Sequence, residues 1–142
     1  MAKIDSIEGV GASYADTLTA AGISTTEALL EKGATAKGRE AIAAQTGISD
    51  KLILRWVNHA DLFRIKGVAG EFAELLEAAG VDTVPELAQR NAANLCEKMT
   101  AVNEEKKLVR KLPTETQVTA WIAEAKSLPK VVTYGSLAQA KG

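Results

Sequence analysis

Two short segments of this chain carry residue types that can hold a phosphate group without a catalytic side chain. Residues 9–13 read Gly-Val-Gly-Ala-Ser, and residues 67–71 read Gly-Val-Ala-Gly-Glu. Glycine adopts backbone conformations that other residues avoid, so the chain can reverse tightly at each segment. A helix that starts there presents backbone N–H groups and the positive end of its dipole. Such a terminus attracts anions, so the expected chemistry is phosphate binding.

The two turns are not equally suited to a phosphate. Ser13 adds a hydroxyl donor after the first turn, whereas Glu71 places a carboxylate near an incoming phosphate at the second. Ala69 replaces the second glycine there, and Gly70 can compensate by one position. The residues that we predict to contact phosphate are Gly9, Val10, Gly11, Ser13, Gly67 and Gly70. The alternative is that the glycines only make tight turns that pack short helices together.

A basic cluster is the second candidate for phosphate contact. Lys106, Lys107, Arg110 and Lys111 follow the spacing i, i+1, i+4 and i+5. On a helix these positions fall close together on one side, which predicts a patch that contacts phosphates. The alternative is an ordinary solvated helix face.

No other group of residues predicts catalysis or metal binding. His59 is the only histidine, it has no serine or cysteine partner in the sequence, and we expect it at the surface or in a helix cap. Cys96, the only cysteine, is expected to be a small buried hydrophobic residue. The carboxylates lack metal-ligand spacing, and no phosphate loop or dinucleotide motif occurs. We therefore predict no catalytic residues, no metal site, no cofactor and no enzymatic activity.

Charge and hydropathy argue against two classes of function, strong nucleic-acid binding and insertion into a membrane. The 142 residues contain 17 basic and 18 acidic side chains, and the isoelectric point is near 5.9. A strong non-specific nucleic-acid binder has a far more basic balance, so any such binding is expected to be weak. No apolar run reaches the roughly 20 residues of a membrane span. We expect a cytoplasmic protein without membrane contact.

The glycine turns open two copies of one repeat. Residues 7–30 and 65–88 align with a constant offset of 58 positions, including Gly9 with Gly67 and Gly22 with Gly80. Helix signals surround both turns. The ranges predicted as helices are 12–21, 24–32, 36–46, 50–64, 71–79, 94–102 and 114–128, with a short helix after Thr83. The expected N-caps are Ser24, Ser49, Thr83, Asn94 and Thr114.

This pattern predicts an all-α fold of two tandem helix-hairpin-helix pseudo-repeats packed into one compact helical domain. Residues 1–64 form the first half and residues 65–134 the second, and we expect the halves to share one core. Residues 135–142 are expected to be a flexible tail. Trp56 and Trp121 occupy equivalent places on apolar helix stripes, so we expect both in the core rather than stacked on bases.

Several segments outside the turns carry a family resemblance. They are residues 33–39, 56–62, 103–113 and 128–134. With these segments the chain resembles the bacterial domain-of-unknown-function family 4332, a tandem helix-hairpin-helix family. The resemblance implies an all-helical fold with paired hairpins and a suspected role in nucleic-acid binding. It implies no catalytic residues.

The expected function is therefore that of a non-enzymatic binding module, which contacts the backbone of DNA or another nucleic acid weakly and without reading sequence. The alternative is a protein-interaction or scaffold module whose hairpins are purely structural. The sequence leaves open whether the protein is a monomer or a homodimer.

Overall fold

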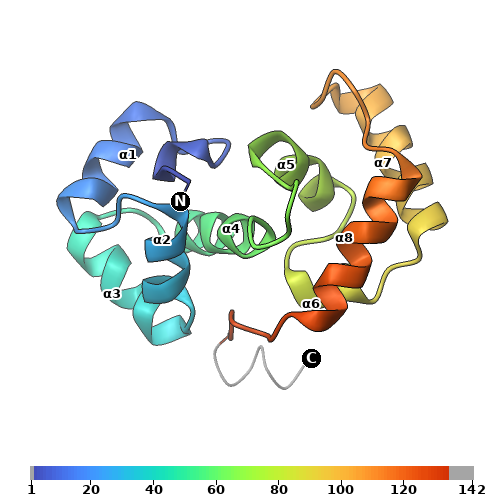
Figure 1. Ribbon diagram of the computed structural model, residues 1–142. Helices are drawn as coiled ribbons and strands as arrows, with labels where there is room; N and C mark the ends of the chain where they lie inside the picture. The colour runs from blue at the N-terminus through green and yellow to red at the C-terminus, as the bar shows by residue number, and fades with distance from the viewer. Residues whose placement is uncertain (1, 135–142) are drawn as a thin grey trace. The chain divides into compact units, whose positions relative to one another are not determined.

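The computed structural model describes residues 2–134, and the predicted tail at residues 135–142 lies outside this range. Its helices, drawn in Figure 1, are α1 (Gly11–Ala20), α2 (Thr26–Gly33), α3 (Ala36–Thr46), α4 (Asp50–Leu62), α5 (Gly70–Ala78), α6 (Val84–Ala88), α7 (Ala92–Lys106) and α8 (Glu115–Ser127), preceded by the 3-10 turn η1 (Ile4–Ser6). Residues 2–134 form no β-strand, apart from one isolated bridge between Lys3 and Thr25. The predicted all-α fold is confirmed.

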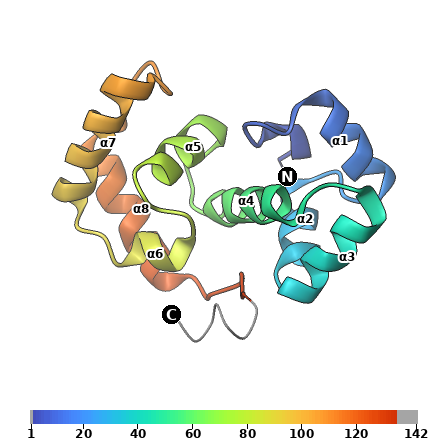
Figure 2. The ribbon, with the colours of Figure 1, turned by 180° about the vertical axis from the view of Figure 1, so that it is seen from behind.

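The chain divides into two compact units. Among the described residues, the first unit contains residues 2–61 and 130–134, and the second contains Leu62–Pro129. In the first unit, α2 packs on α3, and both α1 and α2 contact η1. In the second unit, α8 packs on α6 and α7, and α5 packs on α7. The pairs α2–α3 and α7–α8 lie side by side in both ribbon views (Figures 1 and 2). The expected shared core stays a prediction.

Helix N-termini follow the predicted chemistry, with some shifts in register. Ser49 and Thr114 cap α4 and α8 as expected, and Thr114 forms a complete capping box with Gln117. Two predicted caps are wrong because a neighbouring residue has the extended backbone that a cap needs. Thr25 rather than Ser24 caps α2, and Asn91 rather than Asn94 caps α7.

The third incorrect cap is Thr83. It precedes α6 but makes no side-chain cap bond. Thr83 and Glu86 therefore do not form a capping box. Instead, the Glu86 carboxylate accepts a hydrogen bond from the backbone N–H of Asp82, at 3.4 Å. The short helix α6 is held in place mainly by packing, since Val84 and Leu87 are fully buried.

The first helix of each repeat ends in the same way. Gly22 after α1 and Gly80 after α5 are left-handed, with φ of +87° and +96°. In both copies the residue after the glycine donates to a carbonyl five residues earlier, at 2.8 Å: Ile23 to Leu18 and Val81 to Leu76. This is the Schellman arrangement, which satisfies carbonyl groups at a helix end.

A tryptophan anchors the core of each unit. Trp56 on α4 has 0% exposure and contacts Tyr14 of α1 edge-on, with ring centroids 5.0 Å apart. Trp121 on α8 has 3% exposure and packs on Phe72 of α5 at 5.4 Å. The predicted core role of both tryptophans is confirmed. Tyr14 and Phe72 are 58 positions apart, so the aromatic pair belongs to the repeat.

His59 does not lie at the surface, and that prediction is wrong. Its side chain is completely buried, as is that of Asp61. Val57, Ala60 and Leu62 are buried as well, so the last two turns of α4 are covered around most of their circumference. The apolar stripe of the sequence showed one buried side of this helix and could not show that the opposite side is covered too.

The C-terminal segment at residues 130–134 belongs to the first unit. Its anchor is Arg39 of α3, whose guanidinium donates to the carbonyls of Gly33 at 2.8 Å and Thr133 at 2.7 Å. The backbone N–H of Thr133 donates to Ala34 at 2.7 Å, and the ring of Tyr134 lies 5.8 Å from the Arg39 Cζ. Burial lowers the pKa of Arg39, but a guanidinium stays protonated in proteins.

Candidate nucleic-acid interface

The first glycine turn presents an open helix terminus. Gly9 and Gly11 are both left-handed, with φ of +91° and +65°, and both are exposed. Between them, Val10 is buried with 2% exposure and fixes the turn to the core. A Cβ added at Gly11 would meet no atom within 4 Å. The backbone at Gly11 is therefore accessible to a ligand the size of a phosphate.

The N–H groups at the start of α1 have no side-chain cap. Val10 occupies the N-cap position and makes no such bond. By contrast, Thr25, Thr35, Asn91 and Thr114 each accept a backbone hydrogen bond at the start of α2, α3, α7 and α8. Ser13 is exposed in the first turn of α1, where its hydroxyl can add a donor. Of the helix starts that follow the two glycine turns, the start of α1 is therefore the more favourable for an anion.

Two side chains of α4 lie next to the backbone of the first turn. The indole Nε1 of Trp56 lies 3.9 Å from the position that a Cβ on Gly9 would occupy, and the Nη1 of Arg55 lies 4.0 Å from it. The buried Trp56 N–H has no hydrogen-bond partner among the described residues. Arg55 adds a positive charge beside the turn. Arg55 is not among the residues predicted from the sequence, because its closeness to Gly9 depends on how α4 packs against the turn.

The second glycine turn begins like the first and then departs from it. Gly67 is left-handed, with φ of +90°, and lies over Trp121 as Gly9 lies over Trp56. Ala69, the counterpart of Gly11, is extended, with φ of −123°. Gly70 starts α5 and is buried, and it is not left-handed. Gly70 therefore does not reproduce the conformation of Gly11, although its phosphate contact stays a prediction.

Helix α5 also starts without a side-chain cap, but its first turn carries Glu71. A carboxylate at this position complements the helix dipole and repels a phosphate. The second turn therefore keeps the supporting glycine and tryptophan of the first but offers an anion a less favourable surface.

The basic cluster does not form one side of a helix, and that interpretation is wrong. Helix α7 ends at Lys106, and Lys107 is left-handed, with φ of +51°. The physical reason is Asn103, whose side chain accepts from the Val109 N–H at 3.0 Å and donates to the Val109 carbonyl at 3.1 Å. This pairing turns the chain after α7. All four residues of the cluster are exposed: Lys106, Lys107, Arg110 and Lys111.

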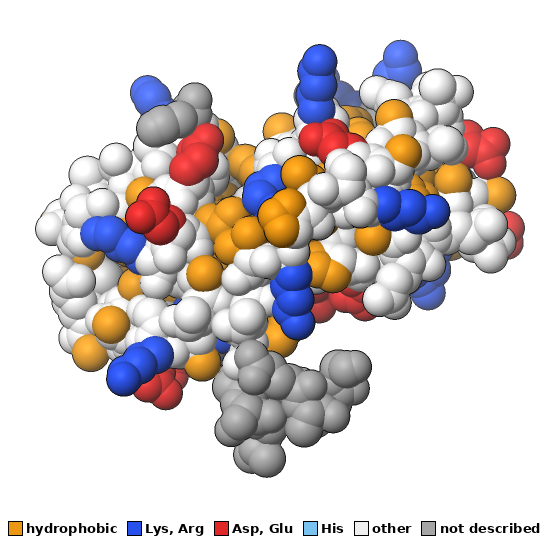
Figure 3. Space-filling view, turned by 60° about the horizontal axis from the view of Figure 1, so that its bottom comes forward, with side chains coloured by type: hydrophobic (Ala, Val, Ile, Leu, Met, Phe, Trp, Pro, Cys, Tyr) orange, Lys and Arg blue, Asp and Glu red, His pale blue; other side chains and the backbone are white. Residues whose placement is uncertain are grey.

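The first turn and the basic cluster belong to different units. Gly9, Val10, Gly11 and Ser13 lie in the first unit, whereas Gly67, Gly70 and the basic cluster lie in the second. On the face drawn in Figure 3, basic and acidic side chains are interspersed among uncharged ones. Within each unit, the part of that face that Figure 3 shows has no continuous basic patch, in keeping with the nearly balanced charge.

The remaining side chains with metal-binding or nucleophilic chemistry are the acidic residues and Cys96. Among residues 2–134, no group of three or more His, Cys, Asp or Glu side chains could hold a metal ion. Cys96 is half-buried and packs against the second unit's core. Burial, together with the nearby Glu115, raises the pKa of its thiol. A raised pKa leaves little of the nucleophilic thiolate at neutral pH.

Comparison with known proteins places the chain in a family. Within residues 2–134, no helix is long and apolar enough to span a bilayer. No curated protein and no solved structure matches the chain. The model of one family, described as a domain of unknown function (DUF4332), matches residues 8–128, which is most of the sequence. The chain therefore belongs to the DUF4332 family.

Proposed function

We propose that this protein is a non-enzymatic module that binds the phosphate backbone of nucleic acid, most readily DNA, in the cytoplasm of a bacterial cell. The contact is made at the first glycine turn, between Gly9 and Ser13. The observation that carries the proposal is the uncapped start of α1 behind an exposed Gly11 with open space around it. Backbone N–H groups in that position bind phosphate without reading sequence.

Charge makes this binding weak. The chain has a formal net charge of −1, so it lacks the long-range attraction of a basic domain. Arg55 beside Gly9 supplies a local positive charge at the turn. A site with so few cationic contacts releases few counterions, and the expected dependence on salt is correspondingly shallow.

Fluorescence anisotropy with labelled single- and double-stranded DNA and RNA tests the proposal. We expect micromolar binding at about 50 mM salt and weaker binding at about 200 mM, with a log–log slope of about −0.9 per phosphate contacted. Gly11→Glu should abolish this binding, because it places a carboxylate at the phosphate position.

Gly47→Glu is the matched control. Gly47, after α3, is also left-handed, with φ of +76°, and its Cβ would also meet no atom within 4 Å. The two variants therefore share the same charge change and the same backbone strain. Equal binding by a folded Gly11→Glu variant and the wild type would overturn the assignment of this turn.

A protein-interaction module is the second candidate. It is favoured by the nearly balanced charge and by Tyr14, a large side chain with 39% exposure beside the first turn. Such a module would ignore nucleic acid even at low salt. Absence of any anisotropy change at about 50 mM salt would therefore select this candidate.

A further inference from the structure

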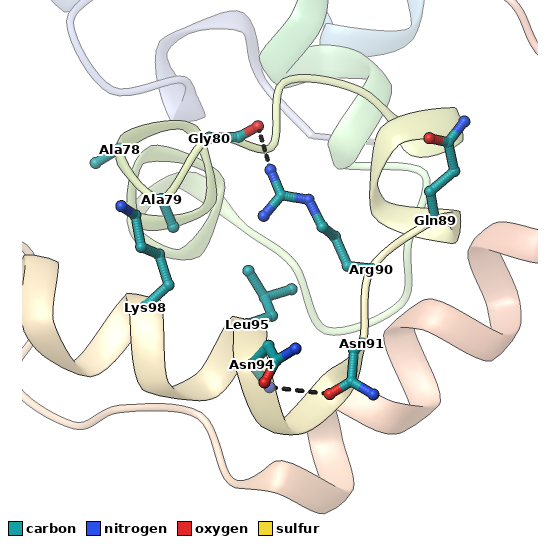
Figure 4. A pocket seen from close by; sticks show the side chains of 9 residues that line it. All are labelled: Ala78, Ala79, Gly80, Gln89, Arg90, Asn91, Asn94, Leu95 and Lys98. Atoms are coloured by element: carbon teal, nitrogen blue, oxygen red, sulfur yellow. Dashed lines mark hydrogen bonds between the residues drawn. The ribbon is translucent and has the colours of Figure 1, made fainter.

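The second unit contains a cavity that the hairpin chemistry does not use. It has a volume of about 740 Å³ and lies between the end of α5 and the start of α7. Figure 4 shows the side chains around it. They are Ala78, Ala79, Gly80, Gln89, Arg90, Asn91, Asn94, Leu95 and Lys98. Its size falls within the range of small-molecule sites, about 300–1,000 Å³.

The lining has the composition of an anion site. Arg90 and Lys98 supply two positive charges, and Gln89, Asn91 and Asn94 supply amide groups. None of the nine lining residues, all within the described range, carries a carboxylate. In a chain with 18 acidic residues, a cavity whose charged lining residues are both cations is a local departure from the overall balance.

Helix α7, which lines this cavity, begins like α3 of the first unit. At the start of α3, the N–H of Gly38 donates to the cap Thr35 at 3.0 Å, and the N–H of Asn94 donates to Asn91 in the same way in α7. A Cβ on Gly38 would clash with the carbonyl of Lys32, so α3 lies directly against the end of α2. Asn94 takes the place of Gly38 relative to the cap in α7, and its side chain lines the cavity.

The two cations have different degrees of freedom. Arg90 is half-buried, and its Nη2 donates to the Gly80 carbonyl at 2.8 Å, as the dashed line in Figure 4 shows. This bond uses one of the five guanidinium donors and fixes the direction of the side chain. Lys98 is exposed and extends from α7 toward Ala78 and Ala79 (Figure 4). One cation is preorganised, and the other can adjust to a ligand.

We propose that this cavity binds a small phosphorylated molecule. The phosphate lies between Arg90 and Lys98, where a planar guanidinium and a flexible ammonium group can share its oxygens. Asn91 lies at the rim of the cavity, where its Oδ1 accepts a hydrogen bond from the Asn94 N–H. Ala79 and Leu95 form an apolar floor for the uncharged part. This site does not depend on the first glycine turn.

Lys32, the residue equivalent to Arg90 in the first copy of the repeat, shows that Arg90 also has a structural role. Lys32 is 58 positions before Arg90, and its Nζ lies 3.1 Å from the position of a Cβ on Gly22. The Nη2 of Arg90 lies 3.1 Å from the same position on Gly80. Both cations therefore stabilise a helix C-terminus. Lys98 is not placed at a helix C-terminus in this way. Changing Lys98 therefore tests ligand binding without removing a contact that stabilises a helix end.

Titration of the ¹⁵N-labelled full chain with glycerol phosphate, followed by NMR, tests the proposal. We expect saturable amide shifts at Arg90, Asn91, Asn94 and Lys98, and no such shifts with uncharged glycerol or with chloride at the same ionic strength. Lys98→Gln should weaken binding about tenfold, since it removes a charge-assisted contact.

Lys126→Gln is the control for net charge. Lys126 is exposed on α8 in the same unit and does not line the cavity. It should leave the affinity unchanged. Three results would each overturn the proposal: no saturable shifts at the lining residues, equal shifts with chloride, or an undiminished affinity in folded Lys98→Gln protein.

Discussion

The two glycine turns share their support and differ in the surface that they present. Gly9 and Gly67 have nearly the same φ, +91° and +90°, and each lies over the indole nitrogen of a core tryptophan. After that point the copies separate. Gly11 is left-handed and exposed, whereas its counterpart Ala69 is extended and is followed by a buried Gly70.

The difference separates what the fold requires from what a ligand requires. Glycine over tryptophan is needed in both units, because it lets the turn pack on the core. The second left-handed glycine, the hydroxyl of Ser13 and the nearby Arg55 occur only at the first turn. The second unit packs its turn on a tryptophan without those features. We therefore propose that the phosphate contact is made at the first turn alone.

The largest expected effect comes from removing the shared support. Trp56→Ala and Trp121→Ala should each lower the free energy of unfolding by about 3–5 kcal/mol, because each leaves a cavity in a core. Urea unfolding followed by circular dichroism measures both losses. A loss below about 1 kcal/mol in either variant would mean that its tryptophan does not anchor its unit.

The glycines over the tryptophans should differ in their tolerance of a methyl group. Gly9→Ala and Gly67→Ala both force a left-handed backbone on alanine, at a cost of about 1–2 kcal/mol. The new Cβ would lie 3.9 Å from Trp56 Nε1 but only 3.3 Å from Trp121 Nε1. Gly67→Ala should therefore be the more destabilising in thermal unfolding. The reverse order would show that the two turns are not supported alike.

Helix capping gives a third, smaller contrast. Thr114→Ala should cost about 1 kcal/mol, since it removes a complete capping box from α8. Ser13→Ala should change stability by less than about 0.5 kcal/mol, because α1 has no side-chain cap to lose. Chemical denaturation compares the two. A marked loss in Ser13→Ala would indicate that its hydroxyl serves the fold rather than a ligand.

The smallest effect concerns the charge at the start of each hairpin helix. Ser13→Glu gives the first turn the acidic group of the second and should weaken nucleic-acid binding about two- to fivefold. Glu71→Ser makes the opposite change and should leave binding unchanged or slightly stronger. Anisotropy at low salt measures both. Equal effects of the two variants would remove the distinction between the turns.

Sequence reasoning succeeded where the signal is local. The N-caps at Ser49 and Thr114 and the bounds of α3 depend on neighbouring residues only. The core tryptophans were predictable because helical periodicity marks a buried side.

It failed where distant parts of the chain decide the structure. The burial of His59 depends on what covers the second side of α4. The end of α7 depends on Asn103 pairing with Val109, which overrides the helical spacing of the basic cluster. Arg55 and the cavity beside Arg90 became recognisable only once the turns and helix ends had positions in space.

The most direct test of the central claim is an NMR titration of the ¹⁵N-labelled protein with a short DNA duplex at about 50 mM salt. The account predicts that the amide signals of Gly11, Ala12 and Ser13 shift with increasing DNA, while those of Gly70, Glu71 and Phe72 stay in place. Shifts at the second turn without shifts at the first, or no shifts at either turn, would contradict it.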